Sequence, residues 1–478
     1  MTPEPPQPDP PGAERSATAD RAPRRLHRSG IAVYAFNALR EAALPLIVLA
    51  VVSGLGGGLD ERALLRGLGF AVLGIVASTV LGYWRWWTTT WWVTPEAIHY
   101  KTGVIGLKET DVPLTRIQSL DLEQGPVQRL FGVYAAHVQT GGGGAKGEIV
   151  LAAVGDDVVR ELRALIADRR PARVAEVAGP ERRLSRRMLL VAALTAGQLG
   201  VILPAVAGFF QLVQSSLDED EAVRLIPHTV GAAVLAAAGL LVVAWLLSVL
   251  GSVVAFAGFT VTREGDRLRI RRGLLARREA TVPVARVRAV AAVEGVLRLP
   301  FRLAALRMEV IGHAKEQAAA QALFPLLRRD EVRPFLDLLL PELADDLDGL
   351  VPPPARAARR YALPPAAAGL AITAAAWVVT GPWALPLAAV LAAYGLLRFR
   401  AAGWRLRDGR LAVRSLRLAR TTVFGPAALR EWHELAQNPL QRRARLADVV
   451  VAFGKQTSAR VRHLDVATAR SVFERLGS

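Results

Sequence analysis

Long apolar runs alternate along this chain with stretches in which apolar and polar residues change places every one or two positions. A membrane-spanning helix needs about 20 mostly apolar residues, and six runs approach that length in three closely spaced pairs. The pattern therefore predicts six transmembrane helices in three hairpins. The runs occupy residues 42–58, 68–87, 188–212, 229–258, 362–380 and 383–397.

The stretch after each hairpin has the pattern of short β-strands. After the first hairpin, residues 91–106 read as two strands around a turn, and residues 134–140 and 148–154 read as two more. A helix with one apolar face follows at 158–169. The chain is therefore predicted to be an α+β membrane protein with three small antiparallel β-barrel or sandwich domains, each closed by a C-terminal helix. These domains are expected at residues 90–170, 259–343 and 401–478.

One stretch identifies the three domains as copies of each other. Residues 111–133, 281–303 and 424–446 align without a gap, and Pro113 and Pro283 are 170 positions apart. The third copy is the most eroded. A fixed spacing over such a length indicates an internal repeat. The protein is thus predicted to be three rounds of one unit, a membrane hairpin followed by a β domain.

Basic residues gather beside the apolar runs. Arginine clusters precede runs one, three and five and follow run six, whereas the connections within each pair are acidic or nearly uncharged. Positive residues mark the loops that stay in the cytoplasm. We therefore expect a multi-pass protein of the inner membrane with its amino terminus and all three β domains in the cytoplasm. Residues 1–30, which are Pro-rich and then basic, are expected to form a disordered tail.

Composition narrows the class of protein. The 478 residues carry a formal net charge of +18, are 52% hydrophobic and have a mean hydropathy of +0.28. The basic charge suits either nucleic acid or anionic lipid. Because the arginines follow the helix ends rather than one soluble face, we expect the anionic lipid of the inner leaflet as partner and no nucleic acid. The sequence contains no cysteine, which excludes disulfides, zinc–thiolate sites and thiol catalysis.

Three segments of the first copy carry a family resemblance. They are the strand pair Val93–Gly103, the Pro113–Gln118 segment and the Gln124–Gly132 segment. With the paired apolar runs, they resemble the bacterial pleckstrin-homology-like domain of the YdbS/YdbT membrane-protein family. The resemblance implies a seven-stranded antiparallel barrel or sandwich capped by a helix. Copy two departs from the pattern, with Glu294 and Arg298 at the positions of the two glutamines of copy one.

Polar residues of the repeat are the candidate binding site. Arginine makes bidentate contacts to phosphate, so these residues could line a polar groove that holds an anionic lipid headgroup or contacts a partner protein. Alternatively, they cap a short helix or brace the mouth of the barrel. The candidates are Arg116, Gln124, Gln128 and Arg129 in copy one, Arg286 and Arg298 in copy two, and Gln437, Gln441 and Arg442 in copy three.

We expect no catalytic, metal or cofactor site. The seven histidines have no partner at a metal-ligand spacing. The glycine run Gly141–Gly144 is followed by Lys146, Gly147 and a strand, whereas a phosphate loop requires Gly-Lys-Ser/Thr opening a helix. An enzyme acting on lipid would need a carboxylate or histidine cluster at the interface, which the sequence does not show.

The function expected is therefore non-enzymatic. The protein would be an integral membrane protein with cytoplasmic binding or scaffold domains, with a protein partner or a second copy of itself as further partners. The resemblance implies a part in membrane stress or in resistance to membrane-active peptides. The alternative is a transporter or channel component with regulatory β domains, which would gain support if Gln198 lined a wet cavity.

Overall fold

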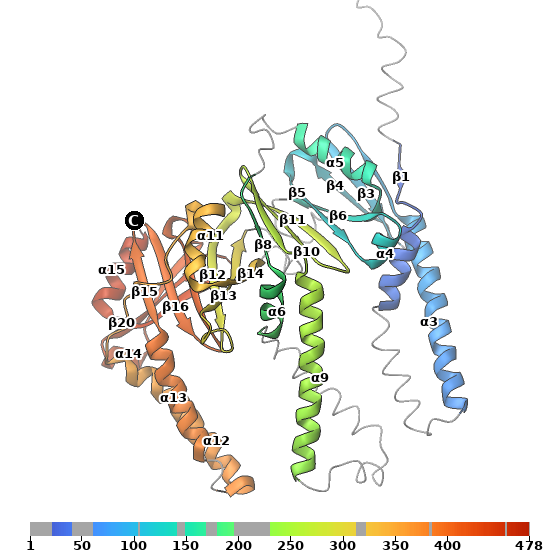
Figure 1. The fold of residues 1–478 in the computed structure, drawn as a ribbon. Coiled ribbons are helices and arrows are strands. Elements are labelled where there is room, and N and C mark those ends of the chain that lie inside the picture. The colour runs from blue at the N-terminus through green and yellow to red at the C-terminus, as the bar shows by residue number, and fades with distance from the viewer. Residues whose placement is uncertain are drawn as a thin grey trace, which may run out of the picture. The chain divides into compact units, whose positions relative to one another are not determined.

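The structure is a computed structural model that describes residues 22–40, 61–103, 106–140, 149–168, 179–195, 230–311, 322–381, 385–454 and 457–477. The described residues fall into two compact units (Figure 1). Unit 1 lies within residues 1–175, 198–255 and 271–280, and unit 2 lies within 176–197, 256–270 and 281–478.

Unit 1 contains the first copy of the repeat, built as two antiparallel sheets. The first sheet has the order β1-β2-β3-β4, and β5, β6 and β7 pair in sequence in the second. Ile98, Val138 and Leu151 fill the space between them, with no exposed surface. The strands are β1 (Arg24–Arg25), β2 (Thr90–Val93), β3 (Ala97–Thr102), β4 (Lys108–Pro113), β5 (Ile117–Gln124), β6 (Tyr134–Thr140) and β7 (Ile149–Val154).

Helices complete unit 1. The helix α5 (Asp156–Asp168) closes the β domain by burying Leu162 and Val159, and its two first-turn aspartates favour a helix start. The short helix α4 (Pro126–Leu130) connects β5 to β6, and α3 (Glu61–Thr88) leads into β2. Residues 30–40 are also helical. The helix α9 (Val230–Phe256) belongs to unit 1 up to residue 255.

The segment before the first helix is held against the β domain. Residues Arg24 and Arg25 form β1, which pairs with β2. The indole of Trp86 donates a 3.0 Å hydrogen bond to the carbonyl of Leu26, and the guanidinium of Arg25 lies 3.9 Å from the ring centre of Trp87. The prediction of a disordered tail over residues 1–30 is therefore wrong for this part, because cation–π and strand contacts fix it. Residues 1–21 lie outside the described residues.

Unit 2 contains most of the second copy and the whole third copy. A six-stranded antiparallel sheet runs in the order β14-β13-β12-β17-β16-β15, and a three-stranded sheet runs β18-β19-β20. The strands of copy two are β8 (Glu181–Arg183), β9 (Thr260–Glu264), β10 (Arg267–Arg272), β11 (Arg277–Pro283), β12 (Val287–Gly295), β13 (Leu303–Val310) and β14 (Ala322–Arg328). Those of copy three are β15 (Gly403–Arg407), β16 (Arg410–Leu416), β17 (Ala419–Pro426), β18 (Trp432–Ala436), β19 (Leu446–Ala452) and β20 (Ser458–Asp465).

The helices of unit 2 take corresponding places. The closing helices are α11 (Val332–Leu339) and α15 (Val466–Gly477), and α14 (Pro439–Arg443) stands where α4 stands in copy one. The helix α6 (Arg186–Leu194) precedes copy two, and α12 (Ala357–Thr380) and α13 (Leu385–Ala401) form a packed pair before copy three.

The repeated proline marks the change from the first sheet to the second in every copy. Pro113, Pro283 and Pro426 each precede a three-residue 3₁₀ turn, with φ of −58°, −62° and −60°. Proline fixes φ near −65°, so it sets the direction in which the chain leaves the strand. This requirement accounts for the proline at the same place in each copy.

The prediction of six transmembrane helices is wrong for the structure. No helix among the described residues is long and apolar enough to cross a membrane. The helix α13 has only 17 residues, and α12 carries Arg359 and Arg360 in its first turn and two internal prolines, whereas a crossing needs about 20 mostly apolar residues. The run at 42–58 and residues 196–212 of the third run lie outside the described residues.

Candidate functional site

The glutamines that align at the end of the repeated strand brace the next strand. Gln124 donates through Nε2 to the carbonyl of Val133 at 3.3 Å. Gln437 donates to the carbonyl of Leu446 at 2.8 Å. In both copies the amide therefore crosses the turn that follows and fixes its two ends.

The next aligned residues contact helix ends. In copy one, Gln128 folds back over Gly125, where a Cβ would lie 2.5 Å from Gln128 Oε1. In copy three, Gln441 completes a capping box with Asn438 and also donates to Asp448 at 2.6 Å. In copy two, Arg298 donates to the carbonyl of Ala192 at 3.1 Å, at the C-terminal end of α6. Burial, with Arg307 nearby, lowers the pKa of Arg298.

The remaining predicted arginines lie near the surface. Arg129 is exposed and donates to the carbonyl of Leu274 at 2.9 Å. Arg116 and Arg442 are exposed, and Arg286 is half-buried, which lowers its pKa. The structure thus does not bring the nine candidates into one pocket. They are distributed over corresponding positions of three separate β domains.

Glu294 replaces the bracing glutamine in copy two and has a different role. It is completely buried, and its carboxylate accepts from Arg329 at 3.0 Å and from Arg420 at 2.6 Å. Arg329 comes from copy two, whereas Arg420 comes from β17 of copy three. The side chain of Arg329 also donates to Asp348 at 2.7 Å. This buried ion network joins the two copies within unit 2.

The turn after the repeated strand exposes large apolar side chains in all three copies. We call residues 125–132, 295–302 and 438–445 the apolar turns. Leu130 is 80% exposed and Phe301 is 70% exposed. A folded protein rarely presents such side chains together unless a partner covers them. The exposed members are Leu130, Phe131, Val296, Leu297, Phe301 and Leu440.

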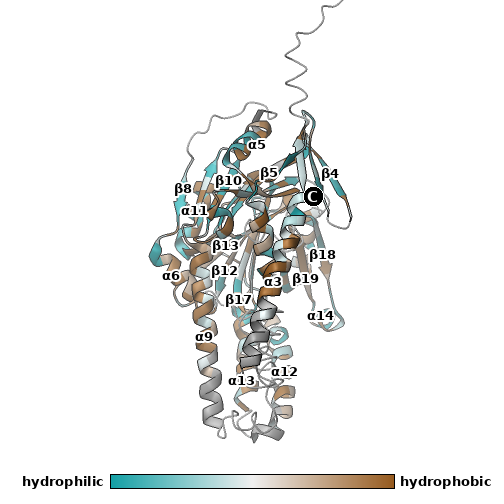
Figure 2. Ribbon diagram, turned by 90° about the vertical axis from the view of Figure 1, so that its right-hand side faces the viewer, coloured by the Kyte–Doolittle hydropathy of each residue, from teal (hydrophilic) through white to brown (hydrophobic). Residues whose placement is uncertain are grey.

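Each apolar turn lies beside a helix of its own unit. Arg298 bonds the end of α6, and Ala444 packs with Tyr361 of α12 and Phe399 of α13. These helices and α3 also expose apolar surface, as the colouring of Figure 2 shows. Exposed large side chains on α3, α12 and α13 are Val72, Leu73, Val76, Val80, Leu81, Leu363, Leu370, Ile372, Val390, Leu396 and Leu397.

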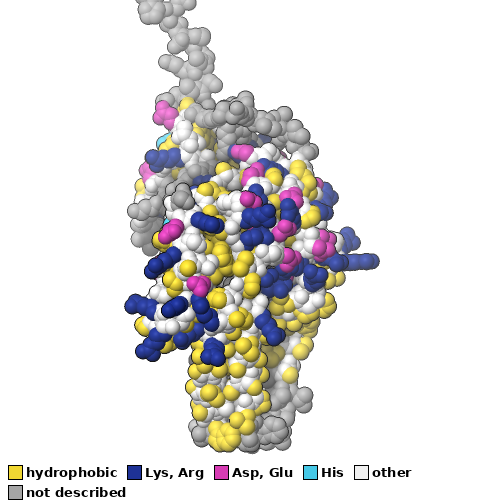
Figure 3. Space-filling model, turned by 90° about the vertical axis from the view of Figure 1, so that its left-hand side faces the viewer, with side chains coloured by type: hydrophobic (Ala, Val, Ile, Leu, Met, Phe, Trp, Pro, Cys, Tyr) yellow, Lys and Arg dark blue, Asp and Glu magenta, His cyan; other side chains and the backbone are white. Residues whose placement is uncertain are grey.

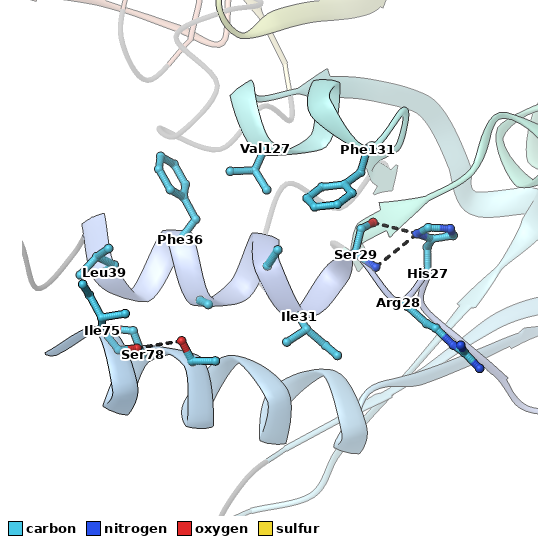
Figure 4. Close-up of a pocket in the computed structure, with 13 residues that line it drawn as sticks. His27, Arg28, Ser29, Ile31, Phe36, Leu39, Ile75, Ser78, Val127 and Phe131 are labelled. Carbon is cyan, nitrogen blue, oxygen red and sulfur yellow. Dashed lines mark hydrogen bonds between the residues drawn. The ribbon is translucent and has the colours of Figure 1, made fainter. Parts of the chain in front are cut away.

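Beside the first apolar turn the surface is hollowed into a groove. Its volume is about 780 Å³, in the usual range for a ligand pocket. Phe36 comes from the helix at 30–40, Ile75 from α3, and Val127 and Phe131 from the turn (Figure 4). The helix at 30–40 approaches α3 closely at Gly82, where a Cβ would lie 2.6 Å from the nitrogen of Ala35. The close packing of these two helices therefore forms part of the groove.

The groove is mainly apolar, with Ser78 and Thr79 of α3 in its lining and His27, Arg28 and Ser29 at one end (Figure 4). His27 Nδ1 accepts from the backbone N–H of Ser29 at 3.3 Å and lies 2.8 Å from its hydroxyl. Arg28 is exposed at this end, and its guanidinium points away from the apolar side chains (Figure 4). A long apolar chain with an anionic head would match this order of surfaces.

The described residues hold no group of three or more His, Asp and Glu side chains that could bind a metal ion. Gln198, whose surroundings would bear on the transporter alternative, and the glycine run at 141–144 lie outside the described residues.

Comparison with known proteins identifies the family. The chain matches the bacterial PH domain family over residues 43–170, 201–343 and 360–478, and it belongs to that family. It is 24% identical over 437 residues to the UPF0699 transmembrane protein YdbT of Bacillus subtilis. The alignment covers 85% of this chain and 86% of that protein. The resemblance derived from the repeat is confirmed.

Sequence reasoning found the turn segments but not the surface they form. The candidates Gln128, Arg129, Arg298, Gln441 and Arg442 all lie on the apolar turns. Their apolar neighbours have no charge or hydrogen-bonding side chain, so a prediction based on headgroup contacts did not include them. The available signal was the apolar residue at aligned positions 127, 297 and 440, which are Val, Leu and Leu.

Proposed function

We propose that this bacterial PH-domain protein is a non-enzymatic binding module that works at a membrane, with its β domains resting on the lipid through the apolar turns. The observation that carries the proposal is the exposure of Phe131, Phe301 and Leu440 on the corresponding turn of all three copies. Burying such a side chain fully contributes about 1.5–3 kcal/mol. Three turns acting together would hold the domains on lipid.

Arginines beside the apolar turns favour an anionic surface. Arg129, Arg302, Arg442 and Arg443 are exposed within the turns, and a basic side chain near an anionic leaflet contributes about 1 kcal/mol. Figure 3 shows hydrophobic side chains over the paired helices of unit 2 and Lys and Arg side chains on the adjoining face of the β domain. This order of surfaces suits the cytoplasmic leaflet, with the amino terminus and the β domains on the cytoplasmic side.

The groove of unit 1 extends the proposal to single lipid molecules. Its apolar walls would take an acyl chain, while Arg28 would meet the anionic head outside it. The relative from Bacillus subtilis is named a transmembrane protein, which supports a place at the membrane for this chain too. As physiological role we infer a response to membrane stress, including resistance to membrane-active peptides, in keeping with the family resemblance.

The test uses the full-length protein reconstituted in lipid nanodiscs. Hydrogen exchange is measured in neutral discs and in discs with anionic lipid. We expect slower exchange in the apolar turns when anionic lipid is present, and we expect Phe131→Asp, Phe301→Asp and Leu440→Asp to abolish the difference. The control is Leu338→Asp, which changes an exposed leucine on the closing helix α11 and should have no effect. Equal exchange of the turns in both lipids contradicts the proposal.

A further inference from the structure

The copies of the repeat are joined by strand pairing in one fixed register. Within unit 1, Arg277 of β11 is paired with Gln124 of β5. Within unit 2, Arg420 of β17 is paired with Glu294 of β12. Gln124 and Glu294 are corresponding residues of copies one and two, and Arg277 and Arg420 are corresponding residues of copies two and three. The two junctions therefore use the same strands of the repeat in the same alignment.

Charged side chains cross both junctions. Arg278 donates to Glu123 at 2.8 Å in the first, and Arg420 donates to Glu294 at 2.6 Å in the second. In each, the strand before the repeated proline turn supplies the arginine, and the strand after that turn in the preceding copy supplies the carboxylate. Both junctions thus carry an arginine–glutamate ion pair, at positions that are offset by one residue between the two.

Among the described strands, the corresponding strand of copy one and that of copy three each have one unpaired edge. The strand β4 of copy one corresponds to β11 and β17, and in the described part of the chain it pairs with β3 alone. The strand β18 of copy three corresponds to β5 and β12, and among the described strands it pairs with β19 alone.

We propose that a second copy of this chain occupies these edges, with β18 of one molecule pairing antiparallel with β4 of the next. Extending the register of the two internal junctions places Glu434 opposite Thr110 and Ala436 opposite Lys108. Lys108 and Glu434 are then diagonal neighbours on one face of the sheet, within reach of an ion pair. Both side chains are exposed in the single chain.

This contact joins two different surfaces, so it is a head-to-tail interface. Such an interface continues from molecule to molecule and gives an open chain or, where the rotation closes, a ring. An unpaired strand edge is a template for a matching strand. In this protein the matching strand is β18, because its counterparts β5 and β12 already pair with the counterparts of β4.

Disulfide trapping tests the proposal directly, because the chain has no cysteine of its own. Two differently tagged full-length chains, one with Thr110→Cys and one with Glu434→Cys, are expressed together, and isolated membranes are oxidised. We expect a disulfide-linked pair carrying both tags. The matched control replaces Glu434→Cys by Glu431→Cys, which is also exposed but lies about 10 Å away along the chain. We expect its yield to be at least fivefold lower.

Two outcomes would overturn the proposal. One is no disulfide, or the same yield with Glu431→Cys as with Glu434→Cys. The other is a chain carrying both Thr110→Cys and Glu434→Cys that cross-links only within itself, because its own β4 then occupies the edge.

An independent measurement uses no cysteine. The mass of the wild-type full-length protein in mild detergent is compared with that of the Lys108→Glu chain and of the Lys108→Glu/Glu434→Lys chain. We expect assemblies for the wild type, smaller species for the single reversal and recovery with the double. A wild-type protein that is only monomeric contradicts the proposal. These results are independent of lipid binding by the apolar turns, so either proposal can fail alone.

Discussion

The buried ion network around Glu294 allows a quantitative prediction. The Glu294 side chain has no exposed surface, and those of its partners Arg329 and Arg420 are 6% and 24% exposed. The substitution Glu294→Gln introduces the residue found at the corresponding positions of copies one and three, with almost no change of shape. It leaves two guanidinium groups without their shared anion. Removing one partner of a buried ion pair typically costs about 3–5 kcal/mol.

A matched substitution at the other junction should behave differently. Glu123 bonds Arg278 at 2.8 Å, but the two side chains are 32% and 47% exposed. Water screens this pair, so Glu123→Gln should cost only about 0.2–1 kcal/mol. Each substitution removes one carboxylate from a junction with the same register. The difference between their costs in stability therefore measures the effect of burial.

Hydrogen exchange in the full-length protein measures both effects strand by strand. For Glu294→Gln, the amides of β12 and β17 should open roughly 10²- to 10⁴-fold more often, since each 1.4 kcal/mol is a factor of ten. For Glu123→Gln, the amides of β5 should change by less than about tenfold. Replacing Glu294, Arg329 and Arg420 together by apolar residues should recover most of the protection. A change below tenfold for Glu294→Gln would refute this reasoning.

Three further predictions concern single contacts. Burial lowers the pKa of His463, although Asp448 opposes the shift; the unfolded chain therefore binds more protons below about pH 6.5, and copy three should lose stability as pH falls below that value. Thermal unfolding from pH 7 to 5 checks this, and His463→Asn should flatten the dependence. Gly82→Ala should destabilise unit 1 by about 1–3 kcal/mol through a backbone clash, whereas Gly69→Ala, with nothing within 4 Å, should stabilise α3 by up to about 1 kcal/mol in denaturant titration. Gln437→Ala should cost about 1 kcal/mol in the same titration, because the carbonyl of Leu446 loses its partner.

The repeat was predictable from the sequence because its spacing has a local cause. Pro113 and its counterparts start the same 3₁₀ turn in every copy. A constraint of this kind acts on neighbouring residues, so it can be identified from the sequence alone. The exchange of glutamine for Glu294 was visible too. Its partners were not, because Arg329 and Arg420 lie 35 and 126 positions away, and nothing near Glu294 indicates that copies two and three share a sheet.

The transmembrane prediction failed for a related reason. It was based on the number of apolar residues in each run. Whether a helix can cross a membrane also depends on its length and its charged residues, and α13 has only 17 residues. The groove was missed because its walls come from separate parts of the sequence. Phe36 lies on a helix with no assigned role, and Phe131 was read only as part of a family motif. The close packing at Gly82, which the sequence does not indicate, helps to bring the helix at 30–40 beside α3.

The central claim is that the apolar turns enter lipid, and spin labels test it most directly. Single cysteines at Phe131, Phe301 and Leu440 can be labelled uniquely, since the chain has no other cysteine. In full-length protein reconstituted with anionic lipid, we predict that all three labels are more accessible to oxygen than to a water-soluble nickel reagent, while a label at Leu338 shows the reverse. Labels at the three turns that respond like the one at Leu338 would place the turns in water and contradict the account.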